Sequence, residues 1–335
     1  MLGRSGLKVS IIVISRNEEK IIEQCLESIF RQTYPNIEVI IVDSSTDNTP
    51  DIIRSLSNFS PFPIKVIFQE AKGCGFARNT GLNEASGDVV TFVDADVLIP
   101  PNYVESAIRE FEDSRCLGVW TKGILAKPSN LLGQVFWLYE RIFHPGKPAV
   151  KNGKCLDATI FRTWFLKDVA RGYNVTLRVG EDVDLWRRVR RKIEELSKEG
   201  FYFKQRNDIE FIEFKHIRDG DFRLRNHFSK MIWYGQGKLC KIRMKSASIW
   251  DLVKELLAPI YLASVPLLTL IAALVAWQCS IFLLPYLALF PLSVLKTLHE
   301  GFKDCNTLLI SLLFPLIMVF KSLGLIIGMV RSIIK

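Results

Sequence analysis

The chain has 335 residues, of which 49% are hydrophobic, and carries a formal net charge of +9. This length suits a catalytic domain of roughly 200 to 250 residues with an appendage better than one small soluble domain. The seven cysteines lie singly along the chain. Their spacing argues against a disulfide framework and against a zinc site built from close cysteine pairs, and it fits a reducing compartment.

Four short runs rich in β-branched residues occur near the start of the chain, at 8–14, 37–42, 64–68 and 88–93. Near-continuous apolar runs of this length are typical of strands buried on both faces. Between the first two runs, apolar residues recur at helical spacing from Ile21 to Phe30 and predict an amphipathic helix. Thr49 followed by Pro50 predicts an N-cap and a first helical turn. This alternation predicts an α/β fold with a mostly parallel, Rossmann-like sheet.

The last part of the chain is strongly apolar, and no charged residue occurs from 256 to 295. A single helix of that length would measure about 60 Å, which is twice the roughly 30 Å hydrocarbon core of a bilayer. The sequence therefore predicts a hairpin of two transmembrane helices at 256–295. A third hydrophobic segment at 307–330 is expected either to span the bilayer or to lie in its interface.

Basic residues concentrate just ahead of this apolar part, between Lys215 and Lys245, with aromatic residues interleaved. Such a stretch is typical of a cytoplasmic juxtamembrane segment that contacts membrane lipids. No secretory hydrophobic stretch precedes the first predicted strand. We therefore expect a cytoplasmic catalytic domain at 1–225, a basic amphipathic connector at 226–255 and a helical transmembrane region at 256–335. Nucleic-acid binding would rest on net charge alone and is not expected.

Polar residues follow each of the four predicted strands. In an open parallel sheet, ligands bind beyond the carboxyl ends of the strands. Asp94-Ala95-Asp96 places two carboxylates at such an end, where magnesium or manganese could meet a diphosphate. Asp43 ends its strand as the ribose-binding acid of an NAD enzyme does, but the first strand lacks the following G-x-G-x-x-G. Simpler interpretations are a capping box at Ser15 and Glu18 and a turn with a helix cap at 43–49.

Five motifs in order along the chain resemble glycosyltransferase family 2, whose members have the GT-A fold. They are Val-Ile-Ser-Arg-Asn-Glu-Glu, Ile-Ile-Val-Asp-Ser-Ser-Thr-Asp-Asn-Thr, Gly-Phe-Ala-Arg-Asn-Thr-Gly, Phe-Val-Asp-Ala-Asp and Gly-Glu-Asp-Val-Asp-Leu, and they cover roughly residues 8 to 220. The resemblance implies inverting, metal-dependent transfer of a sugar from a nucleotide-sugar donor.

The resemblance also implies roles for single residues. Asp43 would bind the nucleobase, Ser15 and Glu18 would line the nucleotide pocket, and Asp94 would approach the ribose or the diphosphate. Asp182 would be the catalytic base, although three acids in a first helical turn also suit the helix dipole. The remaining residues implied are Lys72 and Arg78 for donor binding, and Asp96 and His216 for a magnesium or manganese ion. His216 is equally consistent with a structural histidine.

The expected acceptor follows from the predicted membrane anchor. A tethered enzyme implies a lipid-linked saccharide or a glycolipid, whose hydroxyl would attack the donor at the cytoplasmic face. A polyprenyl (dolichol) phosphate sugar synthase is the alternative, but a phosphate nucleophile is already ionised and needs no base such as Asp182. From another class, a non-catalytic membrane-anchored protein that binds nucleotide sugars would keep the fold without turnover.

Overall fold

The computed structural model describes residues 6–126, 130, 134, 159–177, 179–213, 217–218, 221–222, 228–229, 232 and 327. The chain divides into two compact units. Met1–Ala126 and Gly146–Lys215 form the first unit, and Lys127–Pro145 and His216–Lys335 form the second. In the second unit, strands β9 (Ile217–Arg218) and β10 (Asp221–Phe222) form an antiparallel pair. All elements below belong to the first unit.

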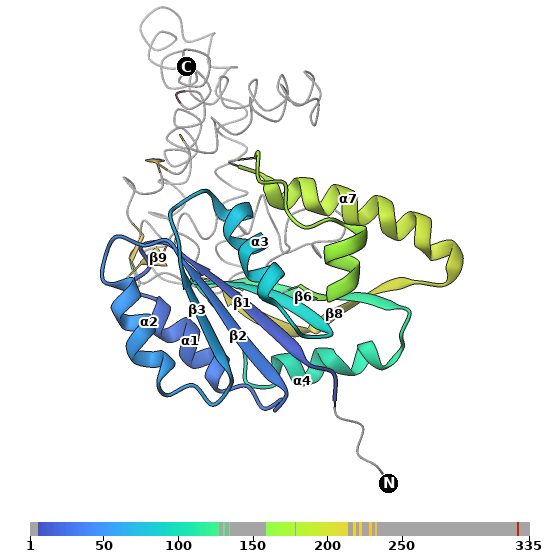
Figure 1. The fold of residues 1–335 in the computed structure, drawn as a ribbon, viewed down its shortest axis with the longest axis horizontal. Coiled ribbons are helices and arrows are strands. Elements are labelled where there is room, and N and C mark those ends of the chain that lie inside the picture. Colours follow the sequence, from blue (N-terminus) through green and yellow to red (C-terminus); the bar gives the residue numbers. More distant parts are fainter. Residues whose placement is uncertain are drawn as a thin grey trace, which may run out of the picture. The chain divides into compact units, whose positions relative to one another are not determined.

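The first four strands form the parallel half of an eight-stranded sheet, in the order β3-β2-β1-β4 (Figure 1). They are β1 (Val9–Ser15), β2 (Ile37–Asp43), β3 (Ile64–Phe68) and β4 (Val89–Asp94). Every strand predicted from the sequence is confirmed within one residue at each end. Ser15 is in register with Asp43, so the polar residues that end β1 and β2 lie side by side.

The other half of the sheet makes it a mixed sheet, where the sequence predicted a mostly parallel one. The order continues β7-β6-β8-β5, and β7 pairs antiparallel with both β4 and β6. These strands are β5 (Val97–Leu98), β6 (Cys116–Leu125), β7 (Ile160–Arg162) and β8 (Tyr202–Glu213). The reversal was not foreseen, because β7 has only three residues and is too short to show a hydrophobic period.

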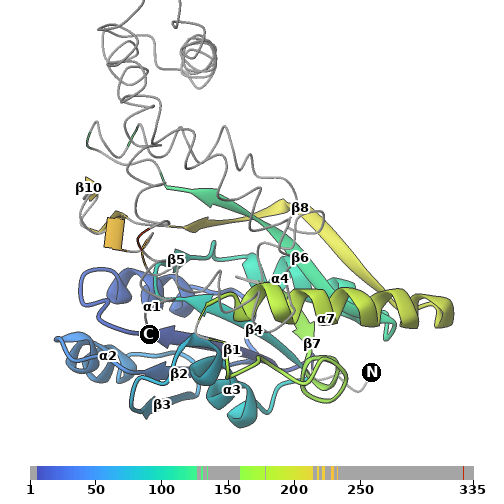
Figure 2. The ribbon, with the colours of Figure 1, turned by 90° about the horizontal axis from the view of Figure 1, so that it is seen from above.

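Helices cover both faces of the sheet (Figures 1 and 2). One apolar layer joins the sheet to α1 (Ile22–Phe30), α2 (Thr49–Ser57), α4 (Tyr103–Ile108) and the 3₁₀ turn η1 (Arg109–Glu112). The opposite layer joins it to α3 (Cys74–Glu84), the π-helical turn η2 (Phe165–Val169) and α7 (Glu181–Leu196), which the 3₁₀ turn η3 (Ser197–Glu199) follows. Alternate residues of each inner strand enter opposite layers, as Ile11 and Ile12 of β1 do.

Two local predictions about helix caps need correction. The N-cap of α2 is Asn48, and Thr49 is the first helical residue, whose hydroxyl donates to Asp47 instead. Ser15 and Glu18 do not form a capping box, because α1 begins only at Ile22 and the Ser15 hydroxyl donates to Asp43. Ser15 bonds to the end of the neighbouring strand, whereas the Thr49 hydroxyl bonds within its own turn, to Asp47 two residues earlier. These contacts replace the predicted caps.

The predicted membrane segments are not tested by the described residues. The hairpin at 256–295 lies outside them, as does the segment at 307–330 apart from Ile327. The connector at 226–255 also lies outside them, except for residues 228–229 and 232. Over the described ranges, no helix is both long enough and apolar enough to cross a bilayer.

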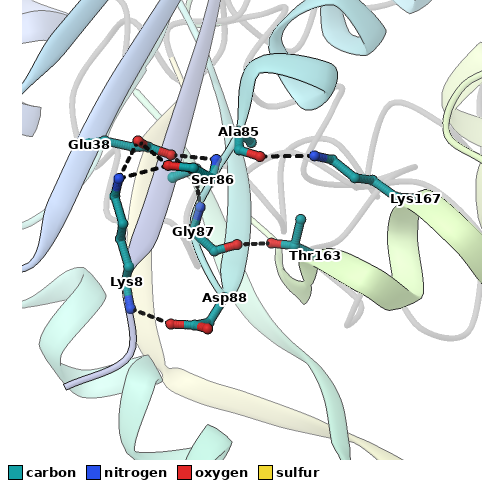
Figure 3. A network of polar contacts seen from close by, with 9 residues as sticks. Lys8, Glu38, Ala85, Ser86, Gly87, Asp88, Thr163 and Lys167 are labelled. Atoms are coloured by element: carbon teal, nitrogen blue, oxygen red, sulfur yellow. Dashed lines mark hydrogen bonds and ion pairs between the residues drawn. The ribbon is translucent and has the colours of Figure 1, made fainter. Parts of the chain in front are cut away.

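At the amino end of the parallel strands, a polar network closes around Glu38 of β2 (Figure 3). Its two carboxylate oxygens accept hydrogen bonds from the Ser10 hydroxyl at 2.6 Å and from the Ser86 amide and hydroxyl at 2.7 Å. Lys8 Nζ lies 2.6 Å from Glu38 Oε2. Burial by itself raises the pKa of Glu38, but these hydrogen bonds outweigh it and lower the pKa to about 2.

The same network ties β4 and η2 to the strands. The Lys8 amide donates to Asp88, and the Gly87 amide donates to the Ser10 hydroxyl. On the other side, the Thr163 hydroxyl donates to the Gly87 carbonyl and Lys167 Nζ to the Ala85 carbonyl, as Figure 3 shows. The network therefore holds the strand starts together through groups that all have partners.

Candidate active site

The carboxyl ends of β1 and β2 are joined through the buried carboxylate of Asp43. Its Oδ1 accepts hydrogen bonds from the hydroxyls of Ser15 and Ser45, both at 2.6 Å. Its Oδ2 accepts one from the Ser45 amide at 3.2 Å. Only 1% of Asp43 is exposed. The structure thus brings together Ser15 and Asp43, two of the residues that the sequence assigned to the donor.

The loops after β1 and β2 are bonded to each other. Asn17 has a left-handed backbone with φ of 57°, its amide donates to the Ser45 hydroxyl, and its side-chain oxygen accepts from the Thr46 amide. The Glu18 amide donates to the Thr49 hydroxyl at 2.9 Å. Non-glycine residues adopt this conformation at a cost that surrounding contacts must offset. Glu18 is half-buried beside this loop pair.

The Asp94-Ala95-Asp96 motif forms the turn between β4 and β5. Cys25 of α1 lies beneath it, and its thiol contacts the Asp94 carbonyl oxygen at 3.6 Å. Burial, reinforced by the negative charges of Asp96 and Asp94, raises the pKa of the Cys25 thiol well above its usual range. Both carboxylates are therefore close enough to act on one buried group.

Arg78 of α3 connects this turn to the start of α7. Its Nη2 donates to both carboxylate oxygens of Asp94, at 2.9 and 3.0 Å, and its Nη1 donates to Glu181 Oε1 at 3.0 Å. Its side chain is only 7% exposed. The guanidinium also lies over the Tyr173 ring, 5.3 Å from the ring centre. One cation therefore serves two carboxylates from distant parts of the chain.

The first turn of α7 carries Glu181, Asp182 and Asp184, as the sequence predicted. Burial raises the pKa of Glu181, Arg78 opposes the rise, and the charges of Asp182 and Asp94 add to it. Asp184 forms an ion pair with Arg188 at 2.9 Å. The half-buried Asp182 carboxylate makes no hydrogen bond or ion pair within the described part of the chain. Of the three acids in this turn, Asp182 alone has no arginine partner among the described residues.

The other predicted residues differ in how they are placed. Lys72 is exposed on the loop before α3, with its Nζ 5.2 Å from the centre of the Phe76 ring. His216 lies outside the described residues, so its predicted metal role is untested. No cluster of three or more histidine, cysteine or acidic side chains suited to a metal occurs in the part of the chain that the structure describes.

The residues at the turn nevertheless fit a hard cation. Magnesium is commonly bound by one or two carboxylates, with waters and substrate phosphates completing its shell. Asp94 and Asp96 provide two carboxylates in one turn, and both act on the thiol of Cys25. Arg78 donates to both oxygens of Asp94, and the resemblance assigns the metal to Asp96.

The sequence did not identify Glu181, Asn79 or Tyr173 as residues of this site. Glu181 was considered only as a helix-dipole acid, yet it is the buried partner of Arg78. Asn79 holds the backbone of Tyr173, because its amide donates to the Tyr173 carbonyl and its oxygen accepts from the Tyr173 amide, each at 2.8 Å. The Arg-Asn pair in the motif Gly-Phe-Ala-Arg-Asn-Thr-Gly was the available signal, but its partners are about a hundred positions away.

Comparisons with known proteins give a family match and several relatives. The model of glycosyl transferase family 2 matches residues 10–173. The uncharacterized glycosyltransferase alr2836 of Nostoc sp. is 38% identical over 114 residues, which cover 34% of this chain and 35% of that protein. The poly(ribitol-phosphate) beta-N-acetylglucosaminyltransferase TarS of Staphylococcus aureus is 26% identical over 230 residues, or 64% of this chain and 39% of that protein. The chain thus spans little more than a third of these relatives.

A solved structure shares the fold. The mannosyltransferase PcManGT from Pyrobaculum calidifontis, solved with GDP-Man and Mn2+, has a TM-score of 0.55 at 19% identity. The likeness covers 98% of this chain and 88% of that one. At this identity it supports a GT-A-like mixed sheet. Residues 10–173 are thus similar in sequence to glycosyl transferase family 2, and the relatives named above are glycosyltransferases.

Proposed function

We propose that the chain transfers a sugar from a nucleotide-sugar donor to a hydroxyl acceptor, with inversion and with the help of a divalent metal. The observation that best supports this proposal is the environment of the Asp182 carboxylate. Asp182 stands in the first turn of α7 beside Glu181, which Arg78 links to the Asp94 end of β4. Its carboxylate has no partner among the described residues, so it is available to take a proton.

The donor would bind along the carboxyl ends of β1, β2 and β4. Asp43 ends β2 beside Ser15, and its acceptor oxygens suit the N–H group of a nucleobase. The hydroxyls of Ser15 and Ser45 hold that carboxylate in place, and Glu18 lies on the neighbouring loop. Lys72 is exposed on the loop before α3, and its ammonium group suits a phosphate oxygen.

In this proposal, Asp96 would hold the metal. A bound magnesium or manganese ion supplies positive charge against the diphosphate that leaves the sugar. Asp94 stays with Arg78 and lies next to the ribose in this arrangement. Asp182 takes the proton of the attacking hydroxyl as the bond to the anomeric carbon forms.

For the acceptor, we propose a lipid-linked saccharide or a glycolipid at the cytoplasmic face of a membrane. The support is the uncharged run at 256–295 and the basic residues that precede it. The alternative is a polyprenyl phosphate acceptor. A phosphate oxygen needs no deprotonation, so in that alternative Asp182 would have no proton to accept.

A screen of UDP- and GDP-sugars with manganese tests the proposal through thermal unfolding. A donor present at a hundred times its Kd stabilises the folded state by about 2.7 kcal/mol, which is a readily measured rise in Tm. We expect one nucleotide class to raise Tm with manganese and to lose the effect with a chelator. Release of free sugar from the bound donor would separate an enzyme from a non-catalytic binding protein. No shift with any member of the panel would contradict the proposal.

A further inference from the structure

Arg78 is buried near the centre of the site although it is charged at any pH. A buried guanidinium needs partners, and this one has Asp94 from β4 and Glu181 from α7. These partners lie 16 and 103 positions from it in sequence. The planar fork of arginine can serve two carboxylates at once, which the point charge of a lysine cannot do in the same way. Arg78 is therefore a structural link between two motifs.

The segment that leads into α7 is fixed to α3 by neighbours of Arg78. Asn79 binds the Tyr173 backbone through two hydrogen bonds of 2.8 Å. Gly75, one turn earlier, packs so closely that an added Cβ would meet both Glu181 and Tyr173 at 3.4 Å. One face of α3 thus determines where the first turn of α7 lies.

Fixing Glu181 also fixes the direction of Asp182. Consecutive residues of a helix point about 100° apart, so the orientation of one determines that of the next. Gly180 precedes them with φ of 80°, and its carbonyl accepts the Asp184 amide at 3.1 Å. Among the described residues, the Asp182 carboxylate itself makes no contact that could orient it. Its position depends on the helix turn, and that turn is held by Glu181.

We propose that Arg78 and Glu181 are positioning residues for transfer: Arg78 fixes Glu181, and through it the carboxylate of Asp182, relative to the Asp94 end of the donor site. This inference rests on the proposed function for its effect on turnover. The part of the inference that concerns the position of the first turn of α7 does not depend on that function. Misplacing a catalytic group by about 1 Å costs roughly a hundredfold in rate, so a positioning role is measurable.

The kinetic test compares Glu181→Ala with Glu181→Gln, using whichever nucleotide sugar the screen identifies. Glutamine keeps an oxygen that can accept from Arg78 Nη1, whereas alanine does not. We expect Glu181→Ala to lower kcat by about 10- to 100-fold, with donor Kd within about threefold, and Glu181→Gln to recover most of that loss. Equal damage by both variants would mean that Glu181 carries a proton itself and would overturn the inference.

A double-mutant cycle tests the link. If Arg78 acts through Glu181, the kcat of Arg78→Met/Glu181→Ala will be close to that of the slower single variant. Additive losses would overturn the link. The matched control is Asp184→Asn, which breaks the ion pair of the same turn with Arg188. It should lower Tm and leave kcat within about twofold.

Hydrogen exchange gives a readout that needs no substrate. The Asp184 amide donates to Gly180 in the first turn of α7. Arg78→Met and Glu181→Ala should each speed its exchange by about tenfold or more, while amides near Val189 remain protected. Unchanged exchange in both variants would overturn the inference whether or not the chain transfers sugar. If both variants speed the exchange of this amide as expected but the wild type transfers no sugar, the proposed function is rejected and the inference about the start of α7 stands.

Discussion

The two ends of the parallel sheet shift the pKa of a carboxyl group in opposite directions. At the amino end, Glu38 accepts hydrogen bonds from Lys8, Ser10 and Ser86, and they lower its pKa to about 2 despite its burial. At the carboxyl end, burial raises the pKa of Glu181, and the charges of Asp182 and Asp94 add to the rise that Arg78 opposes.

The surroundings of Glu38 and of Glu181 differ in how many hydrogen-bond donors face the acids. Around Glu38, both carboxylate oxygens have donors, and the network joins the starts of the strands. Around Arg78, one guanidinium faces Glu181 and Asp94, with Asp182 and Asp96 beside them. An excess of acids at one place is stable only with added positive charge or with raised pKa values, and such places are candidates for function.

The largest effect on turnover is expected from Asp182→Asn, at the carboxyl end of the sheet. Asparagine keeps the size of the side chain but cannot take a proton, so turnover should fall by about two to four orders of magnitude with little change in donor affinity. Steady-state kinetics and donor titration measure both quantities. If Asp182→Asn keeps near-normal turnover, or loses it only by unfolding, the base lies elsewhere and the phosphate-acceptor alternative gains support.

A smaller effect is expected from Asp96, the proposed metal ligand. Asp96→Ala should weaken binding of the donor by roughly 10- to 100-fold in the presence of manganese, and should remove most of the effect of a chelator on the wild type. Isothermal titration measures both. Asp51→Ala, which removes an exposed acid that is paired with Arg54, serves as the control and should bind normally. Equal affinity with and without chelator would remove the metal from the account.

At the amino end, substitution should affect stability alone. Glu38→Gln removes the charge that Lys8, Ser10 and Ser86 surround, so we expect a loss of about 1–3 kcal/mol in the free energy of unfolding with donor affinity unchanged. Denaturant unfolding measures it. Glu27→Gln breaks an exposed ion pair with Arg31 and should cost no more than about 0.5 kcal/mol. A similar small cost for Glu38→Gln would show that the network contributes little.

The two ends should also differ in the sign of their pH dependence. Because the folded-state pKa of Glu38 is depressed, its contribution to stability is complete above its ordinary pKa of 4.5 and is lost as pH falls through about 2. The raised pKa of Glu181 has the opposite effect, so its contribution decreases as pH rises above 4.5. The difference in unfolding free energy between the wild type and Glu38→Gln should increase with pH from about 2 to 4.5, whereas the difference for Glu181→Gln should decrease with pH above 4.5. Denaturant unfolding of the three proteins across pH measures both differences.

The sequence predicted the parallel half of the fold well and the site in part. Continuous apolar runs fix β1 to β4, and the rule for strand ends correctly brings Ser15 and Asp43 together. It did not predict the antiparallel strand β7, because three residues carry no periodic signal. It also did not predict the contact between Arg78 and Glu181, since local patterns cannot show which of many acids a distant arginine will meet.

In the proposed reaction, Asp182 activates a hydroxyl for a single direct displacement at the carboxyl end of the sheet. The most direct test is proton NMR of the first product formed from an α-linked nucleotide sugar, recorded before its anomeric centre can equilibrate. Direct attack predicts a β-configured product, because the incoming oxygen enters opposite the leaving diphosphate. An α-configured product would require a second displacement through an enzyme nucleophile, as in retaining glycosidases, and would contradict the role given to Asp182.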